Sequence, residues 1–186
     1  KIFTTVVIAY LLFASCSSSK NKALRVPKDA STVIRLNGAS ITSKANWNDL
    51  IRADWYRRAR QMNTDSFDKQ LMEHPEQSGI ELKSDFIYFT HKRDFTTYSV
   101  FEGNLKSASD FEKLLKEKNP GKKVEDAGPF HYMLVGNSDL VSWTKSKFVY
   151  IEGQQLMGQS PSVPLDSLTA YAKSIYDLEM QNSIES

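Results

Sequence analysis

Apolar and polar residues follow several distinct patterns along this chain. A nearly apolar run at 2–14 is followed by a polar stretch, and from residue 30 onward apolar residues recur either at every second position or at every third and fourth position. A period of two predicts strands, and the longer period predicts helices. The predicted strands are 30–38, 86–91, 95–105, 122–128, 130–136, 139–145 and 147–153, and the predicted helices are 44–62, 64–74, 107–119 and one beginning at Asp166.

The order of these elements predicts an α+β fold. A strand, helices, a hairpin, another helix and a run of short strands favour a mostly antiparallel sheet with helices on one face, similar to a split βαβ unit with an added meander. The folded domain is expected at 30–160. The stretch 161–186 is expected to be a helix that leads into a truncated C-terminal region.

The apolar N-terminal run is typical of a secretory signal. Lys1 supplies a positive end, and the apolar residues at 2–14 are too few to span a bilayer as a helix, which needs about 20. The run ends at Ala14 and Ser15, and Cys16 follows. Small residues directly before a cysteine resemble the lipobox of bacterial lipoproteins, so 1–15 is predicted to be a lipoprotein signal peptide and Cys16 the lipidated residue.

The residues after Cys16 are small and polar without apolar periodicity. Serines and lysines dominate this stretch, which predicts that 16–29 is a lipidated cysteine followed by a flexible tether. An acyl anchor of this kind would hold the protein firmly to a membrane. Ser17 after the cysteine, by resemblance to lipoprotein sorting rules, favours the outer membrane. The alternative is an ordinary cysteine in a signal peptide cut elsewhere, or a buried thiol.

Composition and charge narrow the classes of partner. The chain of 186 residues has 24 basic and 22 acidic side chains, so its overall charge would not attract nucleic acid. Cys16 is the only cysteine, so the chain has no disulfide within itself. A length of this order fits one domain with its own core.

One cluster in the predicted helix 44–62 suggests binding. Its apolar stripe, which should face inward, is Trp47, Ile51, Trp55, Ala59 and Met62. Beside Trp55, the side chains of Arg57, Arg58 and Arg60 concentrate positive charge, and arginine pairs with carboxylates and other anions through a two-pronged geometry. These four residues are the candidate binding site. The alternative is a solvated helix face with arginine stems over apolar surface.

Catalytic and metal-binding motifs are not recognised in the sequence. His74, His91 and His131 lie far apart and match no zinc pattern, and no glycine-rich phosphate loop occurs. The stretch GQSPS at 158–162 has only half of a nucleophile elbow. The acidic residues of the predicted hairpin and third helix, Asp85, Asp94, Glu102, Asp110 and Glu112, are expected to be surface charges. No cofactor and no metal site are predicted.

Four stretches carry a resemblance to a known family. RVPKDASTVIRLNGASI, GIELKSDFIYFT, LKSASDFEKLLKE and AKSIYDLEMQNSIES look like the lipoproteins of Bacteroidales in the domain-of-unknown-function family numbered 4836. The resemblance covers most of 24–186 and implies a cell-envelope lipoprotein whose full members are longer than this chain. It transfers no catalytic or binding residue to this sequence.

Two classes of function follow from these patterns. The favoured class is a non-enzymatic cell-envelope lipoprotein that is anchored to a membrane and binds or scaffolds an envelope protein or a glycan. The alternative is an envelope enzyme whose active site is completed by a missing C-terminal portion. The ligand, the oligomeric state and the membrane face are left open by the sequence.

Overall fold

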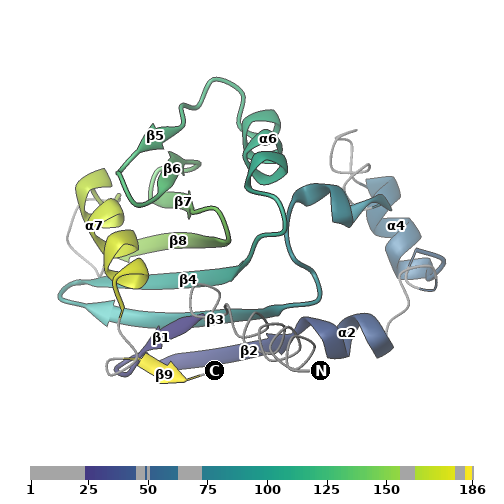
Figure 1. The fold of residues 1–186 in the computed structure, drawn as a ribbon, viewed down its shortest axis with the longest axis horizontal. Helices are drawn as coiled ribbons and strands as arrows, with labels where there is room; N and C mark the ends of the chain where they lie inside the picture. The colour runs from purple at the N-terminus through teal and green to yellow at the C-terminus, as the bar shows by residue number, and fades with distance from the viewer. Residues whose placement is uncertain are drawn as a thin grey trace, which may run out of the picture.

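The computed structural model describes residues 24–44, 49, 51–62, 73–155, 162–178 and 183–185. These residues form a seven-stranded antiparallel sheet, a two-stranded sheet and several helices (Figure 1). The predicted α+β class and the mostly antiparallel sheet are therefore confirmed. Cys16 and most of the predicted helix 64–74 lie outside the described residues.

The seven-stranded sheet has the order β2-β3-β4-β8-β7-β6-β5. Its strands are β2 (Thr32–Asn37), β3 (Asp85–Arg93), β4 (Thr96–Asn104), β5 (Glu125–Asp126), β6 (His131–Leu134), β7 (Asp139–Trp143) and β8 (Lys147–Gln155). The chain passes from β4 through helix α6 (Ala108–Lys118) to the far edge strand β5, and then returns as a meander to β8, which pairs with β4. Strands β4 and β5 therefore run in the same direction with three strands between them. This β4–α6–β5 unit is a split βαβ arrangement, as predicted, in which three strands separate the two parallel ones.

The helices cover both faces of the sheet, and the prediction that they share one face is wrong. Helix α7 (Leu165–Tyr176) packs through Leu168, Tyr171 and Ile175 on the face that carries Phe89, Val100 and Ile151. Helix α6 packs against the opposite face, which carries the large side chains Trp143 and Phe148. Because strand side chains alternate between faces, the sheet presents an apolar row to each helix.

The first described residues belong to the core rather than to a tether. Strand β1 (Arg25–Pro27) pairs with β9 (Ser183–Glu185), and Leu24 and Val26 are buried in the same core as α7. The tether predicted for 16–29 is therefore wrong from residue 24 onward, and the folded part includes these residues. Helix α7 belongs to this core too, so it is not a separate segment after a domain that ends at 160.

The helix predicted over 44–62 is wrong in its bounds. A first helix, α2 (Gly38–Lys44), begins directly after β2, and α4 (Asp54–Met62) follows a turn at 51–53. The side chain of Asn37 accepts a hydrogen bond from the backbone N–H of Ser40 and caps α2. A Cβ on Gly38 would lie 2.1 Å from the carbonyl oxygen of Ser84, so only glycine allows this close approach.

The remaining short features lie at or between the ends of the predicted strands and helices. The side chain of Ser107 accepts from the backbone N–H of Asp110 and caps α6, at the start of the predicted helix 107–119. The β3–β4 hairpin turns at Asp94, whose φ is +54°, and a short 3₁₀ helix η1 (Pro75–Ser78) precedes β3. The ends of helices and strands can be predicted from the sequence because capping and turn formation depend on residues a few positions apart.

A buried ion pair joins β4 to β8. Glu102 is fully buried, and its Oε2 lies 2.6 Å from Nζ of Lys147, which is also buried. The two residues lie diagonally on the α7 face, because Lys147 is opposite Asn104 and Glu102 is opposite Val149. Burial raises the pKa of Glu102, and Lys147 and the backbone of Arg25 oppose this rise. The expectation that Glu102 is a surface charge is therefore wrong.

We expect Lys147→Met to destabilise the fold by about 3–5 kcal/mol at neutral pH, because it leaves a buried carboxylate without its cation. The folded-state pKa of Glu102, already above the usual 4.5, would rise further without Lys147. The folded state then binds a proton that the unfolded state releases, so the variant loses stability as the pH rises above this usual value. Urea unfolding between pH 4.5 and 8 measures this.

The matched control is the double variant Glu102→Met with Lys147→Met, which removes both charges and should recover most of the lost stability. A Lys147→Met protein as stable as the wild type at pH 7 would contradict the role of this pair.

Candidate functional site

The predicted binding residues lie on helix α4. Trp55 is 62% exposed, and its ring meets that of Tyr56 edge to face with centroids 5.6 Å apart. Arg58 is exposed one turn from Trp55, whereas Arg57 forms an ion pair with Asp54. Arg60 is part of the helix, but its side chain is outside the described residues. The structure thus places an exposed indole beside exposed cations on this helix.

The apolar stripe predicted for this helix does not face inward. Trp55 and Met62 are exposed, while Tyr56, a residue outside that stripe, is buried. The stripe was inferred from one continuous helix, and the turn at 51–53 changes the rotation of the residues that follow it. A prediction of the buried side therefore failed together with the prediction of the helix bounds.

A pocket of about 540 Å³ opens where three segments meet on the α7 side of the molecule. The turn after β1 contributes Lys28 and Asp29, the end of β3 contributes His91 to Asp94, and the end of α7 contributes Ser174, Ile175 and Leu178. Cavities of this size hold small ligands in other proteins. Lys28, Lys92 and Arg93 line it together with the carboxylates of Asp29 and Asp94, and Ile175 and Leu178 give it an apolar side.

Both ring nitrogens of His91, which lines this pocket, have a hydrogen-bond partner. Its Nδ1 lies 2.9 Å from the hydroxyl of Tyr171, and its Nε2 lies 3.1 Å from Oδ2 of Asp29. The pKa of Tyr171 is raised, mainly by burial, so its hydroxyl keeps its proton and can donate to Nδ1. Backbone and His91 hydrogen bonds hold the pKa of Asp29 below its usual value, so Asp29 is a carboxylate that accepts from Nε2. The imidazole is thus fixed between two partners.

Ring packing fixes Tyr171 in turn. Its ring stacks on that of Tyr98 with centroids 3.9 Å apart and an interplanar angle of 11°. Tyr98 is on β4, His91 is on β3 and Tyr171 is on α7, so residues from distant parts of the sequence hold this corner of the pocket. The sequence contained no local signal for it.

The other candidate groups remain apart. His74 lies 3.2 Å from Glu76, and His131 lies 3.6 Å from Asp126, each at a separate exposed place. Over the described ranges, no three side chains of the metal-ligating types come together. Asp85 pairs with Arg35, and Glu112 pairs with Lys116 within α6 at 2.6 Å. These carboxylates act as structural or surface charges.

Glu102 was expected at the surface but is fully buried. The alternation in β4 could have located it, because Glu102 has the same parity as Tyr98 and Val100 and therefore faces the core with them. Its partner Lys147 could not be identified from the sequence, since the β4–β8 pairing is long-range.

The chain matches no protein-family model, no curated protein and no solved structure. No helix in the described part of the chain is long and apolar enough to cross a membrane.

We expect Tyr171→Phe to lower the free energy of unfolding by about 1–3 kcal/mol, because it keeps the ring stack but leaves buried Nδ1 of His91 without a partner. Tyr88→Phe is the control, since the Tyr88 hydroxyl makes only a 3.5 Å contact with Ser99. Chemical unfolding of both variants measures the difference. Equal losses in the two proteins would show that the Tyr171 hydroxyl does not support His91.

Proposed function

We propose that this protein is a lipid-anchored cell-envelope lipoprotein whose folded domain binds or scaffolds a partner without catalysis. The observation that carries the proposal is the N-terminal sequence, in which an apolar run of signal-peptide length ends at Ala14, Ser15 and Cys16. The resemblance to Bacteroidales lipoproteins supports the same location, with the outer membrane as the favoured membrane.

The position of the folded domain relative to Cys16 supports a surface-bound protein. Leu24 is the first described residue and is buried, so seven residues, 17–23, separate it from Cys16. The eight Cα–Cα steps from Cys16 to Leu24 span at most about 29 Å when fully extended. An acylated Cys16 would therefore hold the domain close to the lipid headgroups.

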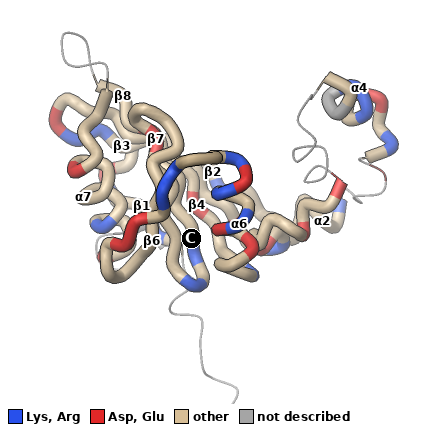
Figure 2. The backbone as a smooth tube through the Cα atoms, turned by 90° about the horizontal axis from the view of Figure 1, so that it is seen from above, with Lys and Arg blue, Asp and Glu red and all other residues tan. Residues whose placement is uncertain are grey.

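Two surfaces of the domain support a binding role. Helix α4 carries exposed Trp55 and Arg58, a combination of residue types that is common where proteins bind partners. Figure 2 shows α4 apart from the sheet, and Arg58 on this helix is exposed. The pocket at His91 is lined by Lys28, Lys92 and Arg93 beside two carboxylates. Both surfaces suit a partner with carboxylates, such as an envelope protein or an acidic glycan.

We expect Cys16→Ala to move the protein from the membrane fraction to the soluble fraction, because the acyl chains have no other attachment residue. Fractionation and metabolic labelling with palmitate measure the change. Ser17→Ala is the matched control and should stay membrane-bound and labelled. A Cys16→Ala protein that remains in membranes would remove the anchor from the proposal.

We expect Arg58→Glu to abolish cross-linking to the envelope partner, because it reverses a charge beside Trp55 without touching the sheet core. Cross-linking in intact cells followed by mass spectrometry measures this. Lys123→Glu makes the same charge change at an exposed position beyond α6 and should retain the partner. If both variants keep the same cross-links, α4 is not the binding surface.

A further inference from the structure

The edge strand β2 is unusually open and apolar. Among the described residues it pairs only with β3, and all six of its residues are exposed. The exposed fractions are 42% for Val33, 48% for Ile34 and 42% for Leu36. Figure 1 shows β2 at the lower edge of the large sheet. An apolar edge of this length is a template for pairing with another strand.

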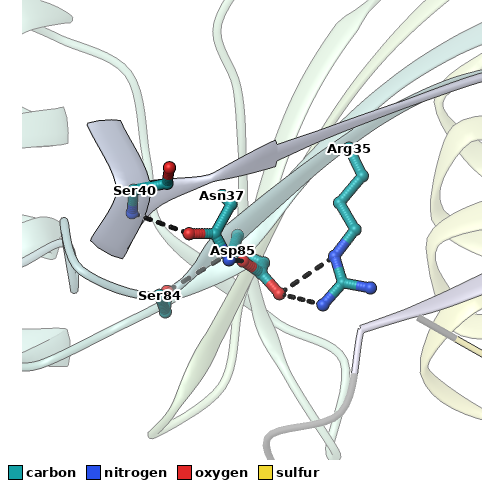
Figure 3. Close-up of polar contacts among 5 residues, drawn as sticks. All are labelled: Arg35, Asn37, Ser40, Ser84 and Asp85. Carbon is teal, nitrogen blue, oxygen red and sulfur yellow. Dashed lines mark hydrogen bonds and ion pairs between the residues drawn. The ribbon is translucent and has the colours of Figure 1, made fainter. Parts of the chain in front are cut away.

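The only charge on β2 is held by its own chain. Nε of Arg35 donates to Oδ2 of Asp85 at 3.0 Å, and Nη2 donates to the same oxygen. Asn37 donates to the other oxygen of Asp85 at 2.8 Å (Figure 3). Natural edge strands are protected by free charges or proline. Here the charge is paired on one face and the strand contains no lysine and no proline, so this protection is missing.

The direction of the backbone groups follows from the β2–β3 ladder. Gly38 donates its N–H to the carbonyl of Ser84, in line with the register that pairs Leu36 with Phe86. Alternate residues of a strand direct their backbone groups to opposite edges. The even-numbered positions of β2 therefore bond to β3. The N–H and C=O groups of Val33 and Arg35 point to the free edge, whereas Asn37 caps α2.

We infer that β2 pairs with β2 of a second copy of this chain, antiparallel, about a two-fold axis at Ile34. In this register the free backbone N–H and C=O groups of Val33 form hydrogen bonds with those of Arg35 from the other copy. The two-fold axis repeats the same bonds between Arg35 and Val33 of the other copy. The neighbouring register would place Arg35 opposite Arg35, and like charges directly opposite are unfavourable. Charge therefore disfavours the register about Arg35, and the register about Ile34 uses the free backbone groups of both Val33 and Arg35.

This pairing joins two seven-stranded sheets into one continuous sheet. Ile34 of each copy meets the other on the face that carries α6, because Ile34 shares its parity with Phe86 and Tyr88. Val33 lies beside the aliphatic stem of Arg35 on the other face. An identical strand thus covers the exposed apolar side chains and supplies the backbone partners. The inference does not depend on lipidation at Cys16.

Disulfide trapping tests the register. In the full chain with Cys16→Ser, an Ile34→Cys variant has one thiol per copy. Across the axis the two Cα atoms would be about 4.5 Å apart, which suits a disulfide. The control Leu36→Cys has a similar exposure, but its counterpart would be about 13 Å away along the strand. We expect Ile34→Cys to form covalent dimers at least about tenfold faster under mild oxidation. Equal rates, or no dimer, would overturn the inference.

Sedimentation velocity of the Cys16→Ser chain tests the pairing without a cross-link. Val33→Pro removes an N–H that faces the free edge and leaves the β2–β3 bonds intact, so it should shift the dimer to monomer. Ile34→Lys should do the same. Ile41→Lys is the matched control, because Ile41 on α2 is also 48% exposed, and it should stay dimeric. A monomeric starting chain, or a dimer that survives Val33→Pro, would overturn the inference.

Discussion

The pairing of β4 with β8 is the constraint on which the rest of the structure depends. It extends from Thr96 opposite Gln155 to Asn104 opposite Lys147 and joins the strands before α6 to the meander after it. Without this ladder the chain would form two smaller sheets. The buried pair of Glu102 and Lys147 sits on it, so an error in the pairing would leave a charge alone in the core. Such a pair specifies one register.

Helix α7 and the two-stranded sheet of β1 and β9 complete the fold. Strand β1 comes from the start of the described chain, and α7 and β9 come from its end. The helix and the two-stranded sheet lie on the same face of the large sheet, where Leu24 and Val26 join Leu168 and Ile175 in one core. The pocket forms at the place where this cover meets the β3–β4 hairpin. His91, Tyr171 and Asp29 keep that corner rigid, since each is fixed by a partner from another element. The same packing that closes the core therefore shapes the pocket.

The two edges of the large sheet differ in a way that bears on assembly. The edge strand β5 has only two residues and both are acidic, which suits an edge that stays unpaired. The edge strand β2 is longer, more apolar and has its charge paired internally. The acyl anchor proposed at Cys16 would bring copies together in similar orientations. Its exposed α4 surface and its pocket would remain available to a different partner.

The sequence by itself determined the local elements. Alternation located β2, β3 and β4, and the helical spacing of apolar residues located α6, because these signals act between residues a few positions apart. The lipobox prediction rests on the same kind of local pattern. Glu102 was misjudged as a surface residue, although its parity with Val100 indicated the core.

Only the tertiary structure decided which residues meet across the chain. The contact of Lys147 with Glu102, the burial of Leu24 and the hydrogen bond of Tyr171 to His91 all join segments distant in sequence. The side of the sheet that each helix covers, and the break at 51–53 in the predicted helix, also depend on packing. Periodicity reports which side of an element is apolar, but its partner is selected by the summed burial of the whole chain.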